Sequence, residues 1–575
     1  MMATSYLRAC FKNQPKRRAK ARGLQETPKI STPCRPPRSP ACRQAGLAGR
    51  FFKHTLGRSG WAFLLCAGLL APRAWAVVQI ASPFTSHMVL QQDATVPVWG
   101  TAERGEDVTV EFAGQKKTVR AGADGKWRVD LKPLKASAQG RVLTVTGSHT
   151  TQPIKLDDVL VGEVWLASGQ SNMDFSVSKK EKSFAGVTNE DQEIAAANYP
   201  LIRMFTGKAA KTYEPQTSVD GEWRVCSPDT VPAFSAVGYF FARGLHRELK
   251  APVGIITLAF GASTAEAWIA RETLAADPQL KPMLDRFDAA CAAFKTNSLD
   301  PARIAEEQKK YEADVAKAKA EGKKTPRRPR NPDPVQDQHN ATVLFNGMIN
   351  PVIPFAIRGV IWYQGESIVG GDAGRALYPR VQAALIRDWR RLWGQGNFPF
   401  YIVQLAGQEA ESNSPWVREA QATALSLPNT GMAVTTDIGE AHNVHPHNKQ
   451  DVGDRLARIA LANVYNRKIE FSGPEYESMK IEGSAIRVKF SHTGGGLVAR
   501  GGPLKWFVIA GADMKFVPAE AKIDGDTVVV SSSEVAAPVA VRYAWVNFPD
   551  GCNLYNAAGL PAAQFRTDNG KNSGL

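Results

Sequence analysis

Short strand-like runs, some alternating between apolar and polar residues and others rich in β-branched residues, occupy two separate parts of the chain. In the first part, residues 77–155, such runs lie at 108–112, 126–131 and 142–146, with Gly or Asp between them about every ten residues. In the second part, residues 468–575, they lie at 485–490, 505–509, 527–530 and 539–545. A period of two predicts strands with one buried face. We therefore expect an N-terminal β-sandwich over 77–155 and a C-terminal all-β domain over 468–575.

A different pattern fills residues 156–467, where nearly continuous apolar runs alternate with amphipathic stretches. The apolar runs lie at 159–167, 253–258, 359–362, 400–404 and 432–436, and the helical stretches lie at 239–249, 378–392 and 452–465. Strands that are buried on both faces have such continuous apolar runs, and their alternation with helices is typical of a parallel sheet. The pattern predicts a doubly wound α/β domain over 156–467.

One segment of this region departs from the alternation. Residues 271–335 contain a charged helical stretch at 303–321, which is followed by a run rich in Lys, Arg and Pro. This composition predicts a helical insertion that leaves the sheet and ends in a linker. We interpret the insertion as a lid or spacer, and a binding role for its basic residues is the alternative.

The charge of the chain is concentrated at its N-terminal end. The net charge is +16, but residues 1–76 hold 15 of the 71 Lys and Arg residues and one of the 55 acidic residues. The rest of the chain therefore has 56 basic and 54 acidic residues. Because this balance is close to neutral, it argues against a nucleic acid or an anionic membrane as the partner.

The same N-terminal segment has the features of an export signal. An apolar run at 61–70 is preceded by Lys53 and Arg58 and is followed by Ala74-Trp75-Ala76. This arrangement predicts a leader and secretory signal peptide over 1–76, cleavage after Ala76, and a secreted or periplasmic protein. A buried helix at 61–70 is the alternative. No later stretch reaches the roughly 18 apolar residues of a membrane span, so we expect no stable membrane insertion.

Ser171 is the first candidate for chemistry. It follows the apolar run 159–167 directly, in a turn that contains Gly169, and a helical continuation is expected after it. The carboxyl end of a parallel strand faces the crevice in which α/β proteins bind ligands, and the N–H groups of a following helix can stabilise an oxyanion. A serine in this position more often only caps a turn. Met173 also stands where the Gly-x-Ser-x-Gly elbow requires glycine.

A histidine cluster supplies a candidate base. His442, His445 and His447 lie in a loop after the predicted strand 432–436, which is again the carboxyl end of a strand. A serine and a histidine that meet at one sheet edge are what a Ser–His pair requires. Two alternatives remain, a metal site made of the three imidazoles and a purely structural cluster. Pro446 and the absence of a carboxylate within the run do not favour metal binding.

Several longer motifs resemble those of the sialate O-acetylesterase family, within the wider SGNH or GDSL-like hydrolases. The resemblance extends over essentially all of residues 77–570. The most specific motif is Val-Trp-Leu-Ala-Ser-Gly-Gln-Ser-Asn-Met at 164–173. The others lie at 88–92, 346–349, 362–367, 388–390, 437–439, 445–446, 448–453, 541–545 and 553–556.

The resemblance implies a fold, an activity and site residues. The fold would be an SGNH-type three-layer α/β/α catalytic domain with a parallel sheet, flanked by N-terminal and C-terminal all-β domains. The activity would be hydrolysis of O-acetyl esters on sugars, with neither a metal nor an organic cofactor. Ser171 would be the nucleophile and His445 the general base. The oxyanion hole would combine the Ser171 and Gly261 N–H groups with the Gln364 side chain, although Ala262 stands where the family tends to have a second glycine.

The group that orients His445 stays open at this point. SGNH hydrolases and their relatives carry an aspartate three or two residues before the histidine, and here these positions hold His442 and Asn443. The imidazole would then be oriented by a main-chain carbonyl, by Asn443, or by Asp437 as a triad carboxylate. Glu366 is expected behind the reacting groups, holding the loop of Gln364.

Three functions are compatible with these residues, in order of preference. The first is a secreted serine esterase that acts on O-acetylated sialic acids. The second is an acetylxylan esterase or another polysaccharide O-acetylesterase, because related sites share their catalytic groups across substrates. The third, motivated only by the missing carboxylate, is a carbohydrate-binding protein on an esterase scaffold.

Overall fold

The computed structural model describes residues 77–150, 152–296, 301–323, 325–326, 333–368, 371–410 and 415–568. The predicted leader, signal peptide and cleavage point after Ala76 lie outside the described residues. Within those residues, no helix combines the length and the apolar character that crossing a membrane requires.

The N-terminal region is built from antiparallel strands, apart from β2, which pairs parallel with β8. One sheet has the order β1-β3-β6, while β4 pairs with β5 and β7, and β7 pairs with β8. Exposed and buried residues alternate strictly along β6, as the sequence pattern predicts. The strands are β1 (Gln79–Ile80), β2 (Val89–Gln91), β3 (Val96–Thr101), β4 (Asp107–Phe112), β5 (Gln115–Arg120), β6 (Lys126–Leu131) and β7 (Ser137–Gly147).

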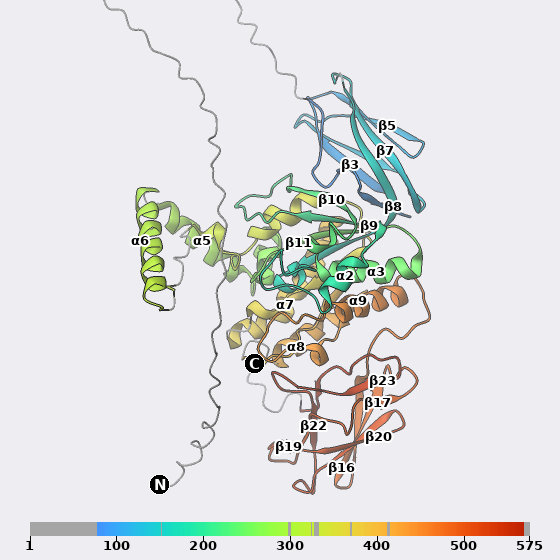
Figure 1. Ribbon diagram of the computed structural model, residues 1–575, viewed down its shortest axis with the longest axis vertical. Helices are drawn as coiled ribbons and strands as arrows, with labels where there is room; N and C mark the ends of the chain where they lie inside the picture. Colours follow the sequence, from blue (N-terminus) through green and yellow to red (C-terminus); the bar gives the residue numbers. More distant parts are fainter. Residues whose placement is uncertain are drawn as a thin grey trace, which may run out of the picture. The chain divides into compact units, whose positions relative to one another are not determined.

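Strand β8 (Ile154–Gly169) connects this region with the central sheet (Figure 1). Its first part pairs antiparallel with β7 and parallel with β2, and its second part pairs parallel with β11 and β12. The boundary expected at 155/156 therefore falls inside a continuous strand. The apolar run begins only at residue 159 because burial alternates along the first residues of β8.

The central sheet has the order β10-β9-β11-β8-β12-β13-β14. All these strands are parallel except β10, which is antiparallel to β9 at the edge. The expected alternation of strands and helices therefore produces a mostly parallel sheet. The remaining strands are β9 (Tyr199–Gly207), β10 (Gly221–Cys226), β11 (Val253–Ala259), β12 (Gly359–Tyr363), β13 (Phe400–Val403) and β14 (Thr430–Ala433).

Helices cover both faces of this sheet. Residues of α3 (Ala236–Leu249) and α9 (Lys449–Asn463) share one buried cluster with Trp165 and Ile361, and residues of α7 (Asp372–Trp393) share another with Leu166 and Trp362. The helix α3 starts earlier than its apolar stripe because the Ser235 hydroxyl accepts the Gly238 N–H and caps it. The shorter helices are α1 (Ser171–Asp174), α2 (Glu190–Ala195) and α8 (Pro415–Ala422).

The insertion and the C-terminal region complete the chain. The insertion holds α4 (Arg271–Ala276), α5 (Lys281–Thr296) and α6 (Pro301–Ala320), and α6 matches the charged helical stretch expected at 303–321. The C-terminal strands form sheets of order β15-β16-β21-β20, β17-β23 and β19-β18-β22-β24 around a separate apolar core. These strands are β15 (Glu475–Glu482), β16 (Ala485–Ser491), β17 (Leu497–Ala499), β18 (Phe507–Ala510), β19 (Val517–Pro518), β20 (Glu520–Asp524), β21 (Thr527–Ser531), β22 (Ala540–Tyr543), β23 (Leu554–Asn556) and β24 (Phe565–Arg566).

Candidate active site

A tight turn at the end of β8 presents Ser171. Gly169 has φ +136°, and a Cβ on it would lie 2.1 Å from the Tyr363 backbone oxygen at the end of β12. Only glycine permits this backbone conformation and this close approach. The next residue, Gln170, is still extended, and Ser171 then opens α1. The serine, which is half-buried, thus stands at the carboxyl end of a central strand of the sheet.

His445 reaches Ser171 from a loop between β14 and α9. Its Nε2 lies 2.8 Å from the Ser171 Oγ. The Phe184 ring lies against the imidazole, with ring centroids 4.7 Å apart. Ser171 and His445, which the sequence placed at the ends of two separate strands, are therefore within hydrogen-bonding distance.

The surroundings of His445 keep its imidazole neutral. Burial lowers its pKa to about 4, and the nearby charges of Lys449 and His447 contribute in the same direction. A neutral imidazole has one ring nitrogen with a free lone pair, and that nitrogen can accept a proton from a hydroxyl. The geometry and the protonation state together suit a general base.

Asn443 holds the backbone of His445 rather than its ring. Its Oδ1 accepts the His445 N–H at 3.0 Å, and its Nδ2 donates to the His445 carbonyl at 2.8 Å. The same Nδ2 also donates to Glu440. Asn443 therefore shapes the loop that carries the imidazole.

Asp437, the carboxylate of the alternative triad, is engaged by other side chains. Its two carboxylate oxygens each accept a hydrogen bond from Arg455 at 2.7 Å, and one of them also accepts the Tyr555 hydroxyl at 2.8 Å. In the described part of the chain, no carboxylate is hydrogen-bonded to the His445 ring. The Arg455 guanidinium on α9 neutralises this carboxylate. Because Asp437 also binds Tyr555 on β23, it links α9 to the C-terminal region.

The other two histidines of the cluster have separate partners. The His442 side chain is 85% exposed and pairs with Glu409 at 3.2 Å. His447 pairs through its Nδ1 with Glu440 at 2.8 Å. The three imidazoles therefore do not converge on one point, and the metal interpretation of the cluster finds no support in their geometry.

The expected oxyanion donors are the N–H groups of Ser171 and Gly261 and the Gln364 side chain. A Cβ on Gly261 would lie 3.7 Å from the Ser171 Cβ, so this backbone passes beside Ser171. Ala262 follows with φ +53°, a left-handed conformation that favours glycine. Gln364 is fully buried at the end of β12; its Nε2 donates to the Ser263 carbonyl at 3.1 Å and its Oε1 accepts the Tyr378 hydroxyl at 3.0 Å. Since an amide has two N–H donors, one of them stays available.

A buried polar network underlies the Ser171–His445 pair. Asn172 donates through its Nδ2 to the Val444 carbonyl at 2.9 Å and to the Glu366 carboxylate, and its Oδ1 accepts the Lys449 ammonium at 2.6 Å. Burial raises the pKa of Glu366 and lowers the pKa of Lys449 to about 7. The Glu366 carboxylate, which was expected to hold the loop of Gln364, thus has Asn172 as its side-chain partner.

Sequence reasoning missed Asn172 and Lys449 as site residues. Both belong to motifs that carry the family resemblance, at 164–173 and 448–453. Lys449 is the first residue of α9 and is fully buried, with its ammonium 4.5 Å from the centre of the Phe175 ring. A lysine at the start of a helix usually lies in solvent, so only its place in the motif could have marked it.

Comparisons with known proteins agree with the resemblance. The family model "Carbohydrate esterase, sialic acid-specific acetylesterase" matches residues 338–462. Sialate O-acetylesterase of Rattus norvegicus is 28% identical over 565 residues, which cover 88% of this chain and 97% of the rat protein. The Homo sapiens sialate O-acetylesterase is 28% identical over 85% of this chain and 92% of its own length.

A solved structure is more similar still. The crystal structure of a carbohydrate acetylesterase from Xanthomonas citri has a TM-score of 0.71 and 36% sequence identity, and the match covers 86% of this chain and 100% of that chain. The resemblance recognised in the sequence motifs is thereby confirmed. The chain belongs to the family of this carbohydrate acetylesterase and is a carboxylic ester hydrolase.

Proposed function

We propose that this esterase removes acetyl groups from sugars through an acetyl-enzyme on Ser171, with His445 as the general base. The observation that carries the proposal is the 2.8 Å distance between the Ser171 Oγ and the His445 Nε2. The depressed pKa of His445, about 4, supports it because the imidazole is then neutral near pH 7. No cofactor takes part in the proposed reaction.

In the first step, Ser171 attacks the acetyl carbonyl while His445 takes its proton. The negative oxygen of the tetrahedral intermediate would be stabilised by the N–H groups of Ser171 and Gly261 and by the Gln364 amide. Each such donor contributes on the order of 3–4 kcal/mol to the transition state. When the intermediate collapses, the imidazolium returns the proton to the departing sugar oxygen, which leaves an acetyl-enzyme and a free hydroxyl group.

In the second step, water replaces the sugar. His445 removes a proton from the water, whose oxygen attacks the acetyl carbonyl, and then protonates the Ser171 oxygen as acetate leaves. We assign His445 to a Ser–His dyad. Asn443, through the backbone of His445, and Asn172, through the Val444 carbonyl, would hold the imidazole in place of a triad carboxylate.

The proposed substrates are O-acetylated sialic acids. The support comes from the sialic acid-specific description of the matching family model and from the two sialate O-acetylesterases that match most of this chain. The alternative, an acetylated polysaccharide such as acetylxylan, draws support from the Xanthomonas citri carbohydrate acetylesterase. Acetate release from O-acetylated sialic acids, measured beside acetylated xylan, separates the two.

The proposed architecture and localisation rest on the sequence. We assign an SGNH-type catalytic domain that begins within β8 and extends to residue 467, a β domain on either side of it, and a signal peptide that is cleaved after Ala76. N-terminal sequencing of the exported protein tests the cleavage point. A first residue other than Val77 would contradict it.

The test of the catalytic assignment is the Ser171→Ala variant with 4-nitrophenyl acetate as substrate. Turnover should fall to the background that remains without a nucleophile, a loss of roughly 10⁴-fold or more. The matched control is Ser183→Ala, which changes an exposed serine and should keep full activity. Retained turnover in Ser171→Ala would exclude Ser171 as the nucleophile. Glycan binding without acetate release in the unaltered protein would instead favour a non-catalytic carbohydrate-binding protein.

A further inference from the structure

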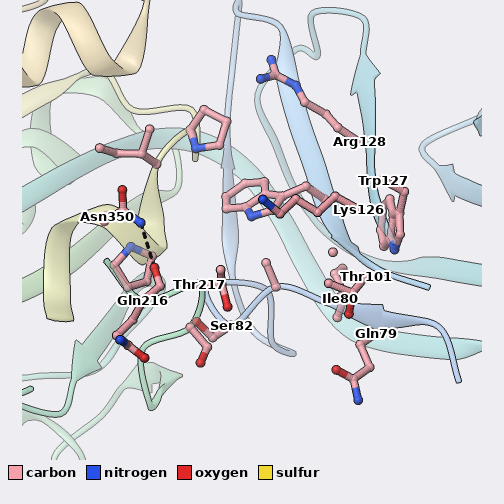
Figure 2. Close-up of a pocket in the computed structure, with 17 residues that line it drawn as sticks. Gln79, Ile80, Ser82, Thr101, Lys126, Trp127, Arg128, Gln216, Thr217 and Asn350 are labelled. Carbon is pink, nitrogen blue, oxygen red and sulfur yellow. Dashed lines mark hydrogen bonds between the residues drawn. The ribbon is translucent and has the colours of Figure 1, made fainter. Parts of the chain in front are cut away.

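A cavity of about 570 Å³ lies apart from Ser171 and His445, and none of the catalytic residues lines it. One wall is the sheet β1-β3-β6, and the other consists of residues 216–218 together with residues 350–354. Figure 2 shows Lys126 and Arg128 on one side of this cavity and Gln216 and Asn350 on the other. Its volume is in the range of small-molecule sites, which is about 300–1,000 Å³.

The strand period brings an aromatic ring and two cations to the same wall. Lys126 and Arg128 are exposed positions of β6, and the antiparallel register places Trp99 opposite Arg128. Residues that are opposite each other in such a pair present their side chains on the same face. Trp99 is half-buried, and an edge-to-face contact with Phe84, with centroids 4.8 Å apart, fixes its ring.

The facing wall offers fixed amides. Asn350 donates through its Nδ2 to the Gln216 backbone oxygen at 2.8 Å, the contact drawn as a dashed line in Figure 2. Gln216 donates through its own Nε2 to the Glu214 carbonyl at 2.9 Å. The side-chain oxygens of both amides have no donor among the residues that the structure describes, so they are free to accept hydrogen bonds from hydroxyl groups.

The two cations are paired weakly enough to bind an anion. Lys126 lies 3.5 Å from Asp124, and the Arg128 Nε lies 2.7 Å from Asp130, with the two basic side chains 67% and 50% exposed. Exposed ion pairs of this kind contribute about 0–1 kcal/mol. The terminal nitrogens of Arg128 have no partner in the described part of the chain, and a guanidinium binds a carboxylate with two parallel hydrogen bonds.

We propose that this cavity binds a sugar unit that carries a carboxylate. The apolar face of the ring would stack on Trp99, the carboxylate would bind Arg128 and Lys126, and hydroxyl groups would donate to Gln216 and Asn350. The cavity is therefore a second glycan-binding site, specific for acidic sugars, outside the catalytic centre. It goes beyond the proposed esterase function and does not depend on it, because binding needs no turnover.

The experiment is isothermal titration calorimetry on the full chain with Ser171→Ala, which prevents hydrolysis. Two acidic probes carry the same carboxylate chemistry from different sources, a sialyl-oligosaccharide and a xylo-oligosaccharide with a glucuronic acid branch, both without acetyl groups. Lactose and an unbranched xylo-oligosaccharide are their neutral counterparts. We expect at least one acidic probe to bind, and the stronger one identifies the source.

Variants assign the binding to this cavity. The double change Lys126→Gln/Arg128→Gln removes exposed charges, so the fold should be kept, and it should weaken binding at least about tenfold, the loss expected for charge-assisted hydrogen bonds. Trp99→Ala should weaken it as well, and Trp99→Phe should restore part of it. The matched control is Lys116→Gln, which removes an equally exposed lysine that pairs with Glu111 on β4 and should bind normally.

Several results would overturn the proposal. They are absence of binding by either acidic probe, equal binding of the neutral probes, unchanged affinity in the double variant, and an equal loss of affinity in Lys116→Gln. The last result would indicate general attraction by positive charge. Circular dichroism on each variant shows whether a loss of binding reflects a loss of fold, and the exposed double variant keeps the test decisive if Trp99→Ala unfolds.

Discussion

The Asn172 side chain donates a 2.9 Å hydrogen bond to the Val444 carbonyl. The first of these residues comes directly after Ser171 in the chain and the second directly before His445. The bond therefore ties the turn after β8 to the loop after β14, although β12 and β13 lie between these strands in the sheet. Ser171 and His445 are the chain neighbours of the two bonded residues, so this hydrogen bond helps to set the distance between them.

Asn172→Ala should lower kcat with little change in KM. Without the tie, the loop of His445 is free to shift, and a displacement of about 1 Å in a catalytic pair costs roughly 100-fold in rate. Initial rates with 4-nitrophenyl acetate measure the effect. The matched control is Asn448→Ala in the same loop, which removes the cap that accepts the Asp451 N–H and should cost about 1 kcal/mol of stability without the loss in kcat. Full activity of Asn172→Ala would contradict the role of the tie.

The pH dependence of kcat/KM is set by the depressed pKa of His445. Only the neutral imidazole accepts a proton, so activity should rise with pH through about 4, where the pKa of His445 lies, and then stay level toward neutral pH. Lys449 has its own pKa lowered to about 7. Its loss of charge above pH 7 should leave the plateau unchanged, since His445 is already neutral there.

Lys449→Met should move the acid limb of this profile to higher pH. The ammonium of Lys449 disfavours the charged imidazole, so its removal raises the pKa of His445 toward its ordinary value of about 6.5. Burial, which is the larger cause of the shift, should keep the pKa below that value. Lys179→Met, which changes an exposed lysine, is the control and should keep the original midpoint. An acid limb that stays in place in Lys449→Met would show that this charge does not act on His445.

Asp437→Asn distinguishes a structural carboxylate from a triad carboxylate. Asp437 is buried against Arg455, with side chains 3% and 8% exposed, and the loss of one partner of a buried pair costs about 3–5 kcal/mol. We therefore expect a lower thermal midpoint and a kcat within a few-fold of the original, whereas loss of a triad aspartate lowers kcat about 10⁴-fold. Asp454→Asn, at the exposed pair with Arg458, should change neither. A collapse of kcat at unchanged stability would restore Asp437 as the orienting group.

The positions of Ser171 and His445 could be predicted because functional residues of a parallel sheet lie at the carboxyl ends of its strands. Apolar runs mark the buried strands, and the residues that come directly after each run lie at that edge. The direct contact between the two side chains could not be derived this way, because the sheet order that brings the loop after β14 to the turn after β8 depends on pairing between distant strands. The family resemblance supplied that link.

The sequence pattern could not predict which partners the charged side chains bind. Asp437 lies close to His445 in the chain, yet Arg455 on α9 takes its carboxylate. Lys449 is buried by the packing of α9 against the site, which no helical period reveals. The boundary between the N-terminal region and the central sheet was also misplaced. Burial alternates along the first residues of β8 and is continuous along the rest, so the sequence pattern resembles two strands although the structure has one.

Gln364→Ala should lower kcat while KM stays nearly constant. The side chain is fixed by its bonds to Ser263 and Tyr378. In the proposed mechanism its second N–H acts only on the oxyanion, so its loss should cost about 10²–10³-fold in kcat. Gln364→Glu should lose as much, because a carboxylate neither donates nor tolerates the developing negative charge. The control is Gln395→Ala, a glutamine whose side chain bonds both backbone groups of Ile357 and whose removal should affect stability alone. If Gln364→Ala lowers only the thermal midpoint, Gln364 braces the loop and the oxyanion is held by backbone N–H groups.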